Sequence, residues 1–283
     1  MSQAGSKGAA LLVNRIVSKV EVERKFNLGP KFASTFLSKD WTKSRLQRLN
    51  VYNNQGNYSF AVLGQPSVII RDTYYDTQGD QLSNLGLWVR QRHVQRLPLE
   101  TSQKNVAHAL KDRFLIRDSS QWNAKLRLGG HFNNSQFAEF DGKENVSDQV
   151  LQITNQKTKL EDLHVVSDLQ TLRSSWEVTH LAGDITPEST ITMVLDEVTE
   201  AQAKGDGLGK PAFTHTIAEL ESFEELVTEG KDSAEHEAER TKLAVRRMEE
   251  LKEFMLANAA LFPTTPKPIG KLTAYDTWKN TRG

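Results

Sequence analysis

Two carboxylates and an ammonium group alternate near the start of the chain, in Val20-Glu21-Val22-Glu23-Arg24-Lys25-Phe26. Side chains of a β-strand alternate between two faces, so Glu21, Glu23 and Lys25 share one face. Carboxylates are hard oxygen ligands for Mg²⁺ or Mn²⁺, and lysine is a point-charge partner for phosphate. This face is suited to a polar cavity that holds metal ions and phosphates, with a solvated surface strand as the alternative interpretation.

The same alternation of charges recurs in three later segments, and the residues between the charges are mostly apolar. The alternating pairs are Arg90 with Arg92, Lys125 with Arg127, and Glu219 with Glu221. An apolar sandwich core does not fit charged residues on so many strands. The pattern predicts a mainly β fold, a closed antiparallel barrel with a charged interior and an apolar outer face covered by helices.

Composition narrows the class of protein. Lys plus Arg and Asp plus Glu both number 36 in 283 residues, so a basic nucleic-acid or membrane-surface binder is not indicated. There is no cysteine, which excludes disulfides and thiolate chemistry. We expect a cytoplasmic monomer that binds a small molecule. The first 19 residues contain three basic and no acidic side chains, so a mitochondrial presequence is the alternative.

The elements that must position these charges follow from periodicity and turn residues. Residues 1–15 are expected to be disordered, and residues 16–283 to form one domain with an insertion at 97–120. Strands are predicted at 20–26, 68–77, 85–94, 124–128, 136–140, 172–181, 190–198 and 217–223, helices within 31–49, 145–170 and 232–260, and loops at 52–57 and 201–211. In the last helix we expect an apolar line of Ala244, Met248, Leu251 and Met255, with Leu243, Arg247 and Glu250 apart from it.

Acids and bases are both expected to point into the barrel. The acids are Glu21, Glu23, Glu139, Asp196, Glu219 and Glu221, and the bases are Lys25, Arg90, Arg92, Lys125, Arg173 and Lys271. Buried ion pairs alone rarely stabilise a protein more than apolar packing does. A bound triphosphate explains both sets, because its oxygens would meet the bases and its metal ions the carboxylates.

These residues resemble the signature of the CYTH proteins, the triphosphate tunnel metalloenzymes. The motif Glu21-x-Glu23-x-Lys25 carries the resemblance, and two later stretches resemble more narrowly the eukaryotic thiamine triphosphatases. The stretches are Arg71-Asp72-Thr73-Tyr74-Tyr75-Asp76-Thr77 and Leu87-Trp88-Val89-Arg90-Gln91-Arg92. The match continues through Trp122 to Lys125, Glu139, Arg173 to Trp176, Asp196, Glu219, Glu221 and Gly270 to Leu272. It implies an eight-stranded antiparallel barrel that forms a tunnel, with helices packed outside.

The resemblance also implies roles for individual residues. Metal ligands fall on Glu21, Glu23, Asp196, Glu219 and Glu221, with Glu139 on the same acidic side. Phosphate-binding residues fall on Lys25, Arg90, Arg92, Lys125, Arg173 and Lys271, and Trp88 falls where a thiamine ring would stack. Arg71 would either face the tunnel or pair with Asp72 or Asp76. Arg127 alternates correctly but matches no family-wide position.

The expected activity is hydrolysis of thiamine triphosphate to thiamine diphosphate and phosphate with Mg²⁺ or Mn²⁺. Lys125 would assist the attacking water or neutralise the terminal phosphate, and Glu219 would help to hold a metal near that water. Inorganic triphosphatase and adenylate cyclase activities in the same fold are alternatives. A non-catalytic module that binds polyphosphates or nucleotides is another.

Overall fold

A computed structural model of the chain describes residues 15–37, 46–53, 56–96, 120–131, 133–181, 190–201 and 213–281. The predicted disordered terminus at 1–15 lies outside these residues except for Arg15. The insertion at 97–120 lies outside them except for its last residue, and the loop at 201–211 except for its first. None of the helices in the described part is long and apolar enough to cross a membrane.

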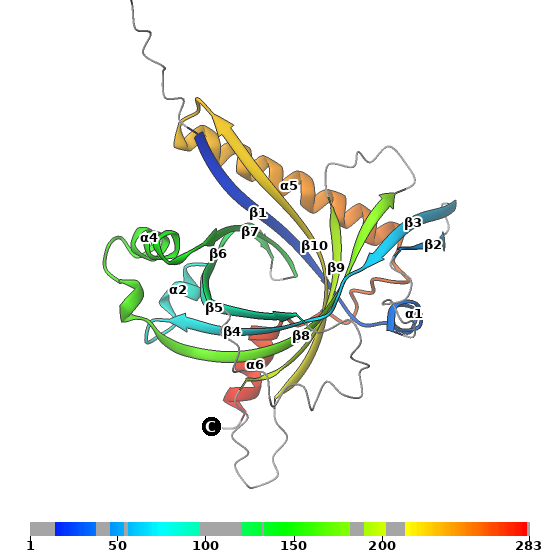
Figure 1. The fold of residues 1–283 in the computed structure, drawn as a ribbon, viewed down its shortest axis with the longest axis horizontal. Coiled ribbons are helices and arrows are strands. Elements are labelled where there is room, and N and C mark those ends of the chain that lie inside the picture. Colours follow the sequence, from blue (N-terminus) through cyan, green and yellow to red (C-terminus); the bar gives the residue numbers. More distant parts are fainter. Residues whose placement is uncertain are drawn as a thin grey trace, which may run out of the picture.

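Ten antiparallel strands make up the sheet, and eight of them close into a barrel (Figure 1). The closed order is β8-β4-β5-β6-β7-β1-β10-β9, with β9 pairing back to β8. The hairpin of β2 and β3 extends from β8. The strands are β1 (Arg15–Phe26), β2 (Leu46–Asn53), β3 (Gly56–Gly64), β4 (Val68–Asp76), β5 (Leu87–Arg96), β6 (Gln121–His131), β7 (Asn134–Asp141), β8 (His164–Leu181), β9 (Ile191–Glu200) and β10 (Thr214–Glu229). The predicted eight-stranded barrel is therefore confirmed.

Helices lie outside the barrel or across one end of it. They are α1 (Pro30–Phe32), the π-helix η1 (Ala33–Leu37), α2 (Gln81–Asn84), α4 (Lys143–Ile153), the 3₁₀-helix η3 (Leu160–Asp162), α5 (Ser233–Ala257) and α6 (Lys271–Asn280). In Figure 1 the long α5 runs along β1 and β10, and α4 lies beside β6 and β7. The short α6 contacts β10 near the C-terminal end of the chain.

The apolar core lies between the outer face of the barrel and these helices, because the inner face is charged. The largest cluster joins β1, β9 and β10 to α5 and to a group of aromatic rings that includes Phe26, Phe32 and Trp176. A second cluster joins Leu87, Val89 and other outer residues of β5 and β6 to α4. The barrel is thus held from outside, and its interior is left free for polar side chains.

Helix α5 is fixed to the barrel by polar as well as apolar contacts. Asp232 caps it by accepting a hydrogen bond from the Glu235 backbone N–H at 2.9 Å. The buried His236 ring bridges two strands, with Nε2 2.6 Å from Ser18 Oγ and Nδ1 2.7 Å from Thr228 Oγ1. These bonds tie α5 to β1 and β10 at once.

Four predictions of local structure are wrong in part. Of the helix expected within 31–49, the structure describes helical residues as far as Leu37, residues 38–45 lie outside the described part, and residues 46–49 belong to β2. Residues 52–57, expected to be a loop, include the ends of β2 and β3, and the helix expected within 145–170 gives way to β8 at His164. In α5, Leu243 and Arg247 are buried together with most of the apolar line: Leu243 belongs to the largest apolar cluster, and Arg247 pairs with Glu224 on β10.

Candidate functional site

Three neighbouring strands line one side of the barrel interior with carboxylates. They are Glu139 on β7, Glu21 and Glu23 on β1, and Glu219 and Glu221 on β10. All five line one cavity of about 270 Å³, which we call the α6-side cavity because the first residues of α6 also line it. The period of two along each strand brings the five groups together.

Basic side chains line the rest of the α6-side cavity. They are Arg90 and Arg92 on β5, Lys125 and Arg127 on β6, Arg173 on β8, Lys271 on α6 and Lys25 on β1. Most of them come from strands outside the β7-β1-β10 group, so an acidic wall faces a mainly basic one. A linear anion that carries divalent cations has the charge pattern that fits between such walls.

Lys25 and Lys125 make ion pairs with the acidic wall. Lys125 contacts Glu21, with its Nζ also 3.7 Å from a Glu23 oxygen and 3.6 Å from a Glu139 oxygen. Burial opposes its charge, but Glu21, Glu23 and Glu139 together raise the pKa of Lys125 above its ordinary value. Lys125 is therefore an ammonium group at neutral pH, which suits charge neutralisation and not proton abstraction.

The carboxylates of the acidic wall are buried close together, and their pKa values therefore differ widely. Burial and the Glu21 carboxylate raise the pKa of Glu139 to about 7. Burial, with Glu21 and Glu219 nearby, raises the pKa of Glu221 to about 7. Burial acts against the charge of Glu21 too, but Lys125 and hydrogen bonds lower the pKa of Glu21 to about 2. The five carboxylates of the acidic wall share ion pairs with Lys25, Lys125 and Arg173, whose Nη1 lies 3.3 Å from Glu221, and their mutual repulsion is a setting in which added cations are favoured.

Two deeply buried aspartates anchor the arginines. Asp72 on β4 accepts two 2.7 Å hydrogen bonds from Arg92, and Asp196 on β9 accepts bonds of 2.7 and 2.8 Å from Arg173. Lys271 Nζ lies 3.6 Å from Asp72 and 3.7 Å from Asp196. Asp196, which the resemblance implied as a metal ligand, thus has both oxygens bound to an arginine. Asp72 was not among the sequence candidates.

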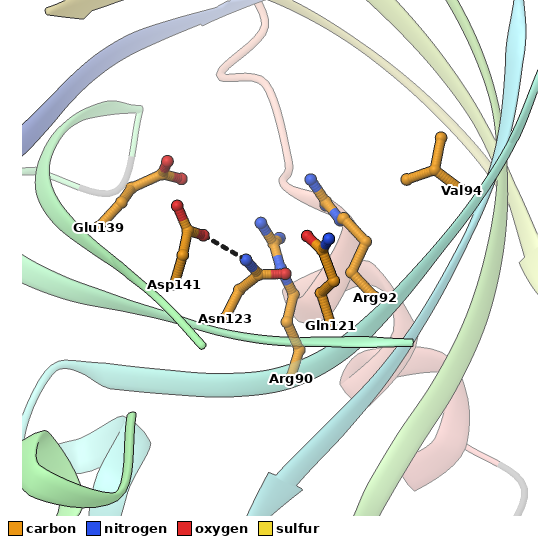
Figure 2. Close-up of a pocket in the computed structure, with 7 residues that line it drawn as sticks. All are labelled: Arg90, Arg92, Val94, Gln121, Asn123, Glu139 and Asp141. Atoms are coloured by element: carbon orange, nitrogen blue, oxygen red, sulfur yellow. Dashed lines mark hydrogen bonds between the residues drawn. The ribbon is translucent and has the colours of Figure 1, made fainter. Parts of the chain in front are cut away.

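A second cavity of about 320 Å³ shares three residues with the first. Arg90, Arg92 and Glu139 line both, and Gln121, Asn123, Asp141 and Val94 complete the second (Figure 2). Figure 2 shows Asn123 bonded to Asp141 beside Arg90. Asn123 precedes Lys125 by two residues and Asp141 follows Glu139 by two, so extending the same alternation along β6 and β7 would have found both.

Three aromatic rings line the α6-side cavity, and each meets a cation of this chain. Arg127 Cζ lies 4.7 Å from the centre of the Trp88 ring, and Lys125 Nζ lies 5.2 Å from the centre of Phe137. Tyr74 lies opposite Arg90 in the register of β4 on β5. The Trp88 and Phe137 rings meet nearly at right angles, 5.7 Å apart.

Arg71 is not part of this cavity. It donates two hydrogen bonds to Asp168 on β8, at 3.0 and 2.6 Å, and so pairs with neither Asp72 nor Asp76. The inward residues of β4 are Asp72 and Tyr74, one position out of phase with Arg71. Both alternating sets of β4 mix apolar and charged residues, so the sequence did not distinguish them.

The side chains of the acidic wall suit a divalent metal ion by their type of donor atom but not by their arrangement. The acidic wall offers hard carboxylate oxygens, which suit Mg²⁺. Among the described residues, however, no three acidic or histidine groups are arranged to hold a metal ion. Lys25 contacts Glu23 and lies 3.2 Å from Glu219. Its ammonium group and that of Lys125 thus occupy the positions beside the carboxylates that metal ions would take. The wall fits metal ions in donor type, provided that these lysines turn toward the bound anion.

Comparisons with known proteins give weak matches only. The chain matches no protein-family model and no curated protein sequence. Among solved structures, a candidate adenylyl cyclase from Hippeastrum, described as having a dominant triphosphatase activity, is 11% identical, with a TM-score of 0.41 over 92% of this chain and 96% of that one. A candidate adenylate cyclase from Vibrio parahaemolyticus is 15% identical, with a TM-score of 0.35 over 90% and 97%. These values assign neither a family nor an activity.

Proposed function

We propose that the barrel interior binds a linear triphosphate and hydrolyses its terminal phosphoanhydride bond with the help of divalent cations. One observation carries the proposal: five carboxylates on three adjacent strands face a basic wall within a single cavity. A structural network of ion pairs would match acids to bases. Here burial and neighbouring carboxylates raise the pKa values of Glu139 and Glu221 to about 7, even though Lys125 lies near Glu139 and Arg173 pairs with Glu221, which is unusual for carboxylates that serve only in structural ion pairs.

The chain's own residues have distinct tasks in this proposal. Arg90, Arg92, Arg173 and Lys271 would bind phosphate oxygens, as would Lys25, and the buried aspartates behind the arginines keep the guanidinium groups oriented. Lys125, held as an ammonium group, would neutralise charge on the terminal phosphate as the bond breaks. Catalysis of this kind depends on positioning and charge stabilisation more than on covalent chemistry.

The proposed metal is Mg²⁺, with Mn²⁺ as the alternative. Glu21, Glu23 and Glu221 would hold one ion, and Glu219 would hold a second, on the side where Asp196 lies. When bound, such ions neutralise phosphate charge and favour in-line attack by water. Of the two tasks that the sequence left open for Lys125, its raised pKa supports charge neutralisation.

Thiamine triphosphate is the substrate that the sequence resemblance implies. Trp88 lines the cavity, as stacking on a thiamine ring would require. Inorganic triphosphate is the second candidate, and the position of Arg127 on Trp88 is the observation that favours it.

Phosphate release tests the proposal. The wild type should release phosphate from thiamine triphosphate, tripolyphosphate or ATP only when Mg²⁺ or Mn²⁺ is present. Glu23→Gln should abolish this turnover, because Glu23 lies at the centre of the acidic wall. The matched control is Glu249→Gln, on the exposed side of α5. Metal-independent release, or full activity of Glu23→Gln at saturating Mg²⁺, would contradict the proposal.

A further inference from the structure

The aromatic side of the α6-side cavity carries its own cations. Trp88, Phe137 and Tyr74 are the aromatic residues among its described lining. Arg127 contacts Trp88, Lys125 contacts Phe137, and Arg90 lies opposite Tyr74 on the next strand. The face of an aromatic ring attracts cations, and a contact at an exposed site contributes about as much as a weak hydrogen bond. In this chain the faces of Trp88 and Phe137 are already occupied by cationic side chains of the protein itself.

Arg127 is the most exposed of these three cations. Its side chain projects from β6 beside β5, where its backbone N–H donates to the Gly86 carbonyl at 2.8 Å. Within the described residues the guanidinium has no ion-pair partner, in contrast to Arg90 and Lys125. Its charge is therefore compensated mainly by the Trp88 ring and by solvent.

We propose that Arg127, stacked on Trp88, is a specificity-determining residue that makes this cavity disfavour a substrate with a cationic headgroup. The inference rests on the proposed triphosphate function and selects among its substrates. A thiazolium ring that approached Trp88 would either displace the guanidinium or lie beside a like charge. A chain that ends in phosphate oxygens gains from the same charge, so the preferred substrate class is an inorganic triphosphate without a cationic organic group.

Besides the five glutamates of the acidic wall, an aspartate on α6 acts in the opposite direction to Arg127. Asp276 on α6 lines the same cavity and could attract a cationic headgroup. Burial and Asp80 raise the pKa of Asp276 above its ordinary value, which weakens that attraction near the acidic end of the pH range. An Asp276→Asn variant therefore tests whether this carboxylate attracts a cationic headgroup.

Calorimetry without metal measures the affinities for tripolyphosphate and for thiamine triphosphate. The ratio of the two affinities shows whether the cavity prefers an inorganic triphosphate or a substrate with a cationic headgroup. The wild type should bind tripolyphosphate more tightly. Arg127→Gln keeps a planar polar end but removes the charge, and should reduce the affinity ratio about tenfold. Arg127→Lys keeps the charge and should keep most of the ratio. The control Arg246→Gln removes an exposed arginine on α5 and should leave the ratio unchanged.

Two results would overturn the inference. One is a wild type that binds thiamine triphosphate more tightly and loses that preference in Asp276→Asn. The other is an Arg127→Gln variant, folded by circular dichroism, whose ratio equals that of the wild type. Failure of the proposed function is a different result: both ligands could show the expected affinity ratio while neither releases phosphate with Mg²⁺.

Discussion

At the scale of single residues, Asp72 shows how the interior keeps its arginines in place. Its carboxylate is 1% exposed and has three cations around it: Arg92 by two hydrogen bonds, Arg90 at 3.7 Å and Lys271 at 3.6 Å. Burial opposes the charge, but these cations hold the pKa of Asp72 well below its ordinary value. One carboxylate among three cations leaves a local excess of positive charge, which is what an anion site needs.

Replacing Asp72 should therefore destabilise the fold and change its response to anions. Asp72→Asn leaves buried cations unpaired and should lower the free energy of unfolding by about 3–5 kcal/mol, measured in urea. Tripolyphosphate should restore more stability to this variant than to the wild type.

The matched control is Asp168→Asn, which removes the partner of Arg71 outside the cavity. That pair is partly exposed, so its loss should cost about 1 kcal/mol or less. Equal losses in the two variants would contradict the anchoring role of Asp72.

At the scale of elements, β7, β1 and β10 act as one acidic wall. Their inward positions bring carboxylates of all three strands together, and two of them, Glu139 and Glu221, have pKa values raised to about 7 from the ordinary 4.5. The folded protein then binds protons that the unfolded chain has released. The wall is therefore a source of instability near neutral pH that bound cations would relieve.

Stability without metal should accordingly fall as pH rises from about 4.5 to 7. In this window the folded state holds more protons than the unfolded state, so the slope of unfolding free energy against pH is negative. Glu139→Gln and Glu221→Gln should each flatten the slope, and urea titrations at several pH values measure it. Glu21, with its pKa lowered to about 2, acts with the opposite sign but only below pH 4.5. A slope that is the same in the two variants as in the wild type would contradict the raised pKa values.

Helix α6 contributes to the site through its first turn. Lys271 there should bind phosphate, so Lys271→Ala should weaken tripolyphosphate binding about ten- to a hundred-fold. Lys279→Ala removes an exposed lysine near the end of the same helix and controls for charge. Calorimetry that finds equal losses for both variants would show that only net charge matters.

At the scale of the whole molecule, the barrel has its apolar core outside and its polar groups inside. This arrangement was accessible from the sequence, because pairs such as Glu21 with Glu23 and Arg90 with Arg92 alternate on strands with apolar residues between them. The closed antiparallel barrel and most of the cavity lining follow from that alternation, and the resemblance implied the number of eight strands. The start of β8 at His164 did not, since the apolar residues of 145–170 suit a helix and a strand equally well.

The details of pairing within the cavity depend on strand register, which the sequence does not specify. The pairing of Asp72 with Arg92 follows from the register of β4 on β5, and that of Arg173 with Asp196 from the register of β8 on β9. The stacking of Arg127 on Trp88 needs the same kind of information, because β5 and β6 are separated by 24 residues of chain. Long-range contacts of this kind set which charges remain available to a ligand.

Binding of tripolyphosphate to the wild type, Arg90→Ala and Arg92→Ala tests whether the barrel interior is a triphosphate site. Calorimetry should show tight binding that Mg²⁺ strengthens, and each variant should lose about ten- to a hundred-fold in affinity. Arg246→Ala, on the outer helix, should bind as the wild type does. Equal affinities in all four proteins would show that the ligand binds outside the barrel, and that the interior is not a triphosphate site.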